Sequence, residues 1–270
     1  MQFSVLMSLY YFEKPEYVKE CFESLLNQTV PADEWIIVED GPLTDEMYEL
    51  LDEYQMKYPL LIKRYRLEEN HGLGLALRVG VNACKNEIIA RMDTDDIARA
   101  DRFEKQIAEF EKNPELDICG SHIIEFDCNT ENVIAKRRVP TMHDSIVHYQ
   151  KRRSAFNHMT VMFRKSTVLS AGNYNYCPCM EDDYLWVRMM KSGAQCMNID
   201  DYLVWARTGI PMIKRRGGWN YFKNYRNGKI KIREVGFINS FDYYLTVFAQ
   251  LLLVFLPDKT KLWMYRHLLR

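Results

Sequence analysis

The 270-residue sequence lacks the cysteine spacings of a zinc finger or of a disulfide framework. Its seven cysteines are scattered, no Cys-x-x-Cys pair occurs, and no histidine lies at finger spacing from Cys177 or Cys179. Regularly spaced cysteines are what structural zinc sites and small disulfide-linked folds need. We therefore expect reduced thiols, as in a cytoplasmic protein, and no structural zinc.

The sequence also has almost no net charge, no internal repeat and no long uninterrupted apolar run. Its 36 Lys and Arg against 37 Asp and Glu leave a formal charge of −1, which gives no reason to expect nucleic acid as a partner. The first strand-like run begins at Phe3, so we expect no signal peptide. The apolar stretch Phe237–Leu256 contains Asp242 and stops at Pro257, which is short for a transmembrane helix.

What the sequence does contain is an alternation of strand and helix patterns over about its first 115 residues. Four runs have the length of strands: residues 3–10, 35–38 and 87–92, which are mainly apolar, and residues 61–67. Helical patterns separate these runs, which predicts right-handed βαβ units. The fold class is therefore α/β, with a Rossmann-like, mostly parallel central sheet flanked by helices. Further on, the pattern is less regular, with strands expected at Asp117–Phe126 and Thr160–Arg164 and a helix at Asp182–Lys191.

Three of the predicted strand ends carry polar or special residues: Ser8-Leu9-Tyr10, Glu39-Asp40-Gly41 and Asp93-Thr94-Asp95-Asp96. In open α/β sheets, ligands bind beyond the carboxyl ends of the strands. We therefore expect these residues to converge in one crevice.

The run Asp93–Asp96 carries three carboxylates on the turn that leaves a buried strand. Hard divalent cations such as Mg²⁺ take oxygen ligands, commonly one or two carboxylates together with phosphate oxygens. The alternative is a solvated acidic turn that caps the following helix, where Asp is favoured. These four residues alone do not decide between the two.

The neighbouring predicted strand ends favour a ligand site. Asp40 ends the second strand, where its carboxylate can accept a hydrogen bond from a base or a ribose. Gly72 and Gly74 open a helix, and glycine lets the backbone approach a ligand closely.

A second acidic group, Glu181-Asp182-Asp183, precedes Tyr184 and a helical pattern. Acids in a first helical turn stabilise the helix dipole without any further role. The functional alternative makes one of them a general base, which contributes about 10²–10⁴-fold to the rate of attack by a hydroxyl.

The C-terminal part differs in composition, being basic and aromatic from Arg215 and then apolar. We divide the chain into a domain over residues 1–210 and a helical extension over residues 211–270. The extension either packs on the domain as a helical hairpin or lies in a membrane interface.

Together these segments resemble a known family. They are Phe3–Gln28, Ile36–Gly41, Asn70–Gly74, Ile89–Asp96, Asn157–Arg164 and Glu181–Trp186. In this order, over roughly residues 3–207, they resemble family 2 glycosyltransferases of the GT-A fold. Within that family the chain is most similar to bacterial enzymes that build O-antigen, capsule or exopolysaccharide.

The resemblance implies a nucleotide-sugar donor, most commonly a UDP-sugar, with Mg²⁺ or Mn²⁺, and inversion at the anomeric carbon. Residues 1–100 then form the nucleotide-sugar half. Asp40 matches the acid that binds the base, and Leu9 and Tyr10 lie on the loop that cradles it. Asp93 and Asp95 match the metal and ribose motif. Asp96 beside them either contacts the donor or caps a helix, and Gly72 belongs to the same donor group.

Residues 101–210 then form the acceptor half. Asp182 matches the catalytic base, with Glu181 next to it. His158 lies on the acceptor side or is a buried structural histidine. We expect the acceptor to be a saccharide linked to polyprenyl diphosphate, at the inner face of the cell membrane. The apolar extension with its basic flanks contacts that face if it lies in the membrane interface rather than packing on the domain.

The sequence departs from the family at two places. Many relatives carry Arg-Asn where this chain has Leu77-Arg78. The family's usual acid-aromatic-acid order after the base is also changed here, because Asp183 precedes Tyr184. Asp182 and Asp183 are therefore alternative bases. Asp183 is placed on the acceptor side. Arg207, or the pair Arg215-Arg216, either touches the diphosphate from a mobile loop or forms a solvated basic patch.

Two other functions compete with sugar transfer. A nucleotidyltransferase needs a glycine-rich, basic loop after the first strand, which Ser8–Pro15 lacks. A sugar-nucleotide-binding or assembly module without turnover does not need both acidic groups, which are present.

Overall fold

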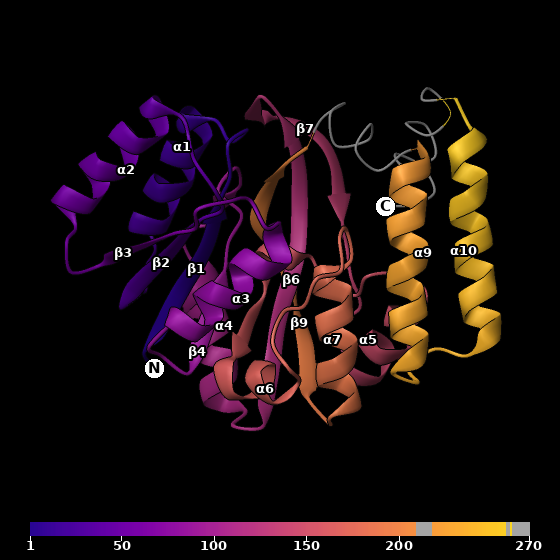
Figure 1. Cartoon of the computed structure of the whole chain (residues 1–270). Coiled ribbons are helices and arrows are strands. Elements are labelled where there is room, and N and C mark those ends of the chain that lie inside the picture. Colours follow the sequence, from indigo (N-terminus) through magenta and orange to yellow (C-terminus); the bar gives the residue numbers. More distant parts are fainter. Residues whose placement is uncertain (209–217, 258–259, 261–270) are drawn as a thin grey trace.

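The computed structural model describes residues 1–208, 218–257 and 260, and its strands form a single sheet (Figure 1). The sheet order is β3-β2-β1-β4-β8-β6-β9-β5, and β7 pairs with β6. The strands are β1 Phe3–Leu9, β2 Glu34–Glu39, β3 Ile62–Arg66, β4 Ile88–Arg91, β5 Ile97–Ala98, β6 Leu116–Asp127, β7 Asn129–Arg137, β8 Met162–Arg164 and β9 Gln195–Arg207.

Most of these strands run in one direction. Strands β1 to β4 are mutually parallel, and β6 is parallel to β9. Both β4 and β6 are antiparallel to β8, so they share a direction. The short strand β5 and the hairpin strand β7 also run against their neighbours. The predicted α/β fold with a mostly parallel sheet is confirmed, and the strands that run against the others are β5, β7 and β8.

Helices cover both faces of the sheet. They are α1 Pro15–Leu26, α2 Asp45–Lys57, α3 Leu73–Ala83, α4 Arg102–Lys112, α5 His143–Gln150, α6 Lys165–Ser170, α7 Glu181–Lys191, α9 Gly218–Glu234 and α10 Ser240–Phe255. Side chains of β1 alternate between faces. Val5 and Met7 join the apolar core under α1, α2 and α4, whereas Leu6 joins the core under α3 and α7.

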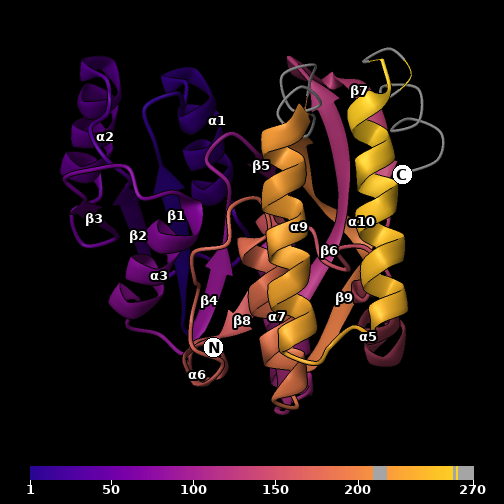
Figure 2. The same cartoon turned by 45° about the vertical axis from the view of Figure 1, so that its right-hand side comes forward.

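The C-terminal segment is a helical hairpin that packs on the domain. Figure 1 shows α9 between α7 and α10, and Figure 2 shows α9 in front of α7. Val187 of α7 and Met180, its N-cap residue, share a small apolar core with Ile232 of α9 and Tyr243 of α10. The hairpin is one of the two arrangements expected from the sequence. The division at residue 210 lies outside the described residues and stays a prediction.

None of the described helices combines the length and the apolar character needed to cross a bilayer.

Candidate active site

The two acidic groups expected from the sequence face one cleft. Its volume is about 850 Å³, and Asp93, His158 and the first turn of α7 contribute to its walls. The charge of Asp93 also raises the pKa of Glu181, which is consistent with their facing each other across the cleft. Segments that lie 88 residues apart, 93 and 181, therefore form one site.

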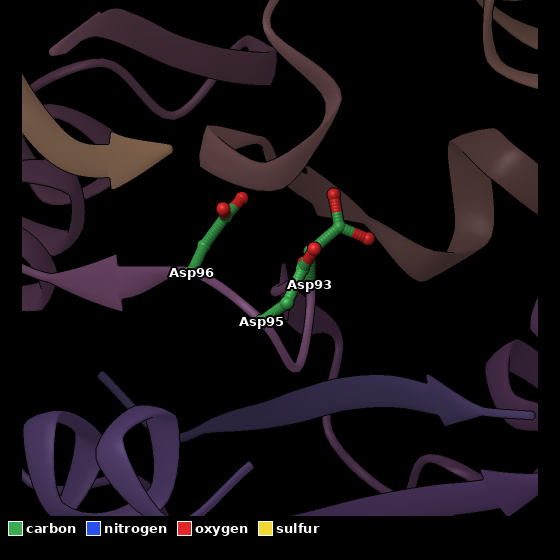
Figure 3. A group of neighbouring side chains, drawn as sticks. All are labelled: Asp93, Asp95 and Asp96. Atoms are coloured by element: carbon green, nitrogen blue, oxygen red, sulfur yellow. The ribbon is translucent and has the colours of Figure 1, made fainter. Parts of the chain in front are cut away.

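The acidic turn connects β4 to β5. Figure 3 shows Asp93, Asp95 and Asp96 projecting from the same side of this turn, and one carboxylate oxygen of each lies within 4.8 Å of the others. Burial, reinforced by the charges of Asp95 and Asp93, raises the pKa of Asp96 well above its usual range. Its Oδ1 accepts a hydrogen bond from Arg207 N at 2.7 Å, but its Oδ2 has no partner among the described residues.

This arrangement fits a divalent cation. Three close carboxylates, one of them with an orphaned buried oxygen, lose repulsion and gain a partner when a hard cation lies between them. The metal reading of the turn therefore stands on its geometry as well as on its composition.

The alternative in which the turn caps the next helix is wrong. Helix α4 begins only at Arg102, after the N-cap residue Asp101. Between the turn and α4, strand β5 pairs with β9, Ile97 opposite Trp205. Because this short strand intervenes, Asp96 lies too far from the helix to cap it.

Arg91 is a site residue that sequence reasoning missed. Its side chain is only 2% exposed and forms an ion pair with Asp93. Its Nε and Nη1 have no partner among the described residues, and the residue lines the cleft. Its charge lowers the pKa of Glu181 and of Asp182, so it also acts on the second acidic group. The feature of the sequence that could have identified Arg91 is its position in an apolar strand, two residues before Asp93.

Arg207 holds the acidic turn through hydrogen bonds to Asp95 and Asp96. It ends β9, so the expectation that it belongs to a mobile loop is wrong. Its Nε donates to Asp95 O at 3.0 Å, its guanidinium pairs with Glu20, and its side chain stacks on Tyr17. The pair Arg215-Arg216 lies outside the described residues.

The second acidic group occupies the first turn of α7, after the N-cap residue Met180. Burial, and then the charges of Asp183 and Glu181, raise the pKa of Asp182 to about 8. Asp183 is held by Gln150, whose Nε2 donates to its Oδ1 at 2.6 Å. No described side chain donates to Asp182 in this way. Asp182 is therefore the better placed of the two to accept a proton.

Asp40 is turned toward its own loop. It is buried, and its carboxylate accepts hydrogen bonds from His71 N at 2.8 Å and from Gly72 N at 2.9 Å. Gly72 has φ +86°, a conformation that glycine adopts without strain. Asp40 thereby fixes the loop that leads into α3.

The remaining donor-side residues do not line the cleft. Leu9 is fully buried, Tyr10 is partly exposed, and neither lines the cleft. Gly72 borders a smaller hollow of about 190 Å³ that it shares with Glu181. The structure does not bring Leu9, Tyr10 and Asp40 into the cleft, and their roles at the base stay predictions.

His158 lines the cleft and is also part of the structure that supports it. Its Nε2 lies 2.9 Å from Tyr174 Oη, and its ring packs edge-on to Trp186. Burial lowers its pKa well below the usual range, so the ring is neutral at pH 7. Nearby, Arg78 donates to Tyr174 O and to Asn175 Oδ1, so this departure from the family fixes a loop at the wall of the site.

An α/β sheet with clustered carboxylates after β4, facing further acids on a helix of its second half, defines a GT-A glycosyltransferase. The chain belongs to a family of such enzymes: the model described as "Glycosyl transferase family 2" matches residues 4–170.

Relatives extend this match over the whole chain. An amylovoran biosynthesis glycosyltransferase of Erwinia amylovora is 42% identical over 90% of this chain and 91% of its own. An Escherichia coli UDP-Gal:α-D-GlcNAc-diphosphoundecaprenol β-1,3-galactosyltransferase is 33% identical over 100% of this chain and 97% of its own. The fold is that of a Pyrobaculum calidifontis mannosyltransferase solved with GDP-Man and Mn²⁺, with TM-score 0.64, 13% identity, and coverage of 97% of this chain and 72% of that one. The chain is a glycosyltransferase of the kind used in bacterial surface polysaccharide synthesis.

Proposed function

We propose that this glycosyltransferase moves a sugar, with inversion, from a UDP-sugar to a hydroxyl of a saccharide linked to polyprenyl diphosphate. The observation that carries the proposal is that Asp93, which follows β4, and Asp182, in the first turn of α7, line the same cleft. The donor and acceptor classes are supported by the galactosyltransferase relative, whose name states UDP-Gal and a diphosphoundecaprenol-linked sugar.

Asp182 is the general base in this mechanism. As the acceptor oxygen forms its bond to the anomeric carbon, the bond from that carbon to the diphosphate oxygen breaks, and the hydroxyl proton passes to Asp182. Attack from the face opposite the leaving group inverts the anomeric centre. Glu181 and Asp183 flank the base, and their charges help to keep its pKa high enough to take a proton.

Asp93 and Asp95, with Asp96 beside them, would hold Mg²⁺ or Mn²⁺. Such a cation supplies positive charge to the departing diphosphate. Mn²⁺ is the ion found with the mannosyltransferase of similar fold. Arg91 holds Asp93 in place through its ion pair.

Peripheral contact with the inner face of the cell membrane is supported by α10. Six large apolar or aromatic side chains are exposed on it, at spacings that place them on one face: Phe241, Tyr244, Leu245, Phe248, Leu252 and Phe255. An apolar stripe on an edge helix is the feature that lies in a lipid interface.

A donor screen tests the function. The protein is incubated with a panel of UDP-sugars and a lipid-diphosphate-linked saccharide, and UDP release and product mass are measured. We expect transfer with one donor, lost in EDTA and restored by Mn²⁺ or Mg²⁺. Full activity in EDTA would contradict the metal role. Calorimetric UDP binding without hydrolysis or transfer would instead indicate a non-catalytic module.

A further inference from the structure

The cleft continues beyond the acids to the C-terminal hairpin. Arg152 and Arg153, which follow α5, and Lys229 of α9 line this continuation. Beyond them, α10 contributes apolar side chains, among them Leu245 and Leu253.

These groups follow one another in a definite order. Gln150, at the end of α5, donates to Asp183 in the second acidic group. Two residues further on, Arg152 Nε donates to Asp242 Oδ1 at 2.7 Å, in the first turn of α10. Figure 1 shows α9 between α7 and α10, so the residues that line the cleft are acids on α7, cations beside α5 and on α9, and apolar side chains on α10.

Lys229 is the unusual member of this wall. It is only 3% exposed, and the hydrogen bond that its ammonium makes, to Lys151 O, is long at 3.5 Å. It forms no ion pair within the part of the chain that the structure describes, and its other close partner there is the ring of Tyr225, 5.6 Å away. Burial lowers its pKa, and the charges of Asp183 and Asp242 only partly offset this. A buried ammonium with so few partners is costly unless an anion completes its surroundings.

We propose that this wall binds the diphosphate that joins the acceptor saccharide to its polyprenyl chain, with Lys229, Arg152 and Arg153 as its ligands. The hydrocarbon next to the diphosphate then lies against Leu245 and Leu253. This deepens the proposed function and rests on its lipid-linked acceptor.

Charge and order both support this occupant. A diphosphate near Glu181, Asp182 and Asp183 would be repelled unless cations offset those charges, and hydrogen bonds from cations to phosphate oxygens are strong. The order of the cleft is also that of the acceptor, in which a reacting hydroxyl is followed by a diphosphate and then by hydrocarbon.

Calorimetric titration with farnesyl diphosphate, a diphosphate on a short isoprenoid chain, tests the site without a saccharide. EDTA is present, so that no cation joins the probe to Asp93 or Asp95. We expect binding by the unaltered protein, about tenfold weaker in Lys229→Gln and in Arg153→Gln. Lys223→Gln is the matched control, because Lys223 is exposed on the same helix and does not line the cleft. Farnesol, which lacks the diphosphate, should bind far more weakly.

The proposal is overturned if farnesyl diphosphate does not bind, if farnesol binds equally tightly, or if Lys229→Gln and Arg153→Gln bind farnesyl diphosphate no more weakly than the control Lys223→Gln does. Arg153 is exposed, so its variant is informative even where Lys229→Gln disturbs the fold. The donor screen is read separately. A protein that binds the probe but transfers no sugar refutes the proposed function and not the site, and the reverse result refutes only the site.

Discussion

At the scale of single residues, the site depends on electrostatic interactions within and between two acidic groups, Asp93–Asp96 and Glu181–Asp183. Arg91 is buried, forms an ion pair with Asp93, and lowers the pKa of Asp182 through its charge. Asp96 and Asp182 are both carboxyls whose pKa is raised first by burial and then by neighbouring acids. At Asp96, a bound cation would relieve the repulsion that raises the pKa. At Asp182, the raised pKa suits a group that must accept a proton.

The raised pKa of Asp182 gives a pH prediction. A base acts only when ionised, so kcat/KM should fall as the pH drops through about 8, the value to which burial and the two flanking acids raise it. Asp183→Asn removes one of these charges, keeps an oxygen for Gln150, and should move the acidic limb to lower pH. Profiles of the two proteins measured side by side check this. Superimposable limbs would show that Asp183 does not tune the base.

At the scale of elements, helix α3 brings a glycine against the second acidic group. A Cβ on Gly74 would lie 3.0 Å from Glu181 Cβ and 3.2 Å from Asn175 O. Gly80, in the same helix, faces the sheet instead, where a Cβ would overlap Leu6. The same substitution at these two positions therefore separates a catalytic effect from a packing effect.

Gly74→Ala should lower kcat by about tenfold, because small displacements of catalytic groups are costly. The stability of this variant should hardly change. Alanine has a higher helix propensity than glycine by about 1 kcal/mol, which offsets the crowding of the new methyl group against Glu181. Gly80→Ala should lose about 1–3 kcal/mol of unfolding free energy through overpacking. Denaturant unfolding and initial rates on both variants check the contrast. Equal losses of stability at both positions would contradict it.

The sequence predicted the first half of the fold better than the second. Strands β1, β2 and β4 are short apolar runs buried on both faces, so composition alone reveals them. Strand β9 carries Asn198, Asp200 and Asp201, and its pairing with β6 rather than its own pattern makes it a strand. Helix α5, which supplies Gln150 to Asp183, was also missed, because it is short and only Ile146 and Gln150 on it are buried.

The candidate site was predictable where acids follow a strand or begin a helix. The basic residues of the site could not be predicted. Arg91 lies within an apolar strand, and Lys229 lies in a helix that meets the cleft only through tertiary packing. Asp40 was found by its position at a strand end. Its hydrogen bonds to the Gly72 loop could not be read from that position.

At the scale of the whole molecule, the hairpin α9–α10 connects the cleft to an exposed apolar face. One side of α10 lines the cleft, and the stripe that includes Phe241, Phe248 and Phe255 is exposed; Leu245, at the edge of the stripe, also lines the cleft. An enzyme whose acceptor carries a polyprenyl chain can use both sides, one for the substrate and one for the membrane that holds it.

Phe248→Asp should weaken binding to vesicles of phosphatidylethanolamine and phosphatidylglycerol by about tenfold or more, because a buried aromatic side chain contributes about 1.5–3 kcal/mol. Leu60→Asp is the control, since Leu60 is equally apolar and 91% exposed but lies far along the chain from the hairpin. Cosedimentation checks both variants. Vesicle binding that is unchanged in Phe248→Asp, or reduced to the same extent in Leu60→Asp, would contradict a membrane role for α10.

The central claim is a two-part site in which Asp182 activates the acceptor while the acids after β4 serve the donor. The most direct test is the rate of sugar transfer by Asp182→Asn compared with Asp183→Asn, at saturating donor and Mn²⁺. The account predicts a loss of about 10²–10⁴-fold for Asp182→Asn, with Asp183→Asn retaining most of the activity. Transfer that survives Asp182→Asn unchanged, or a larger loss in Asp183→Asn, would contradict it.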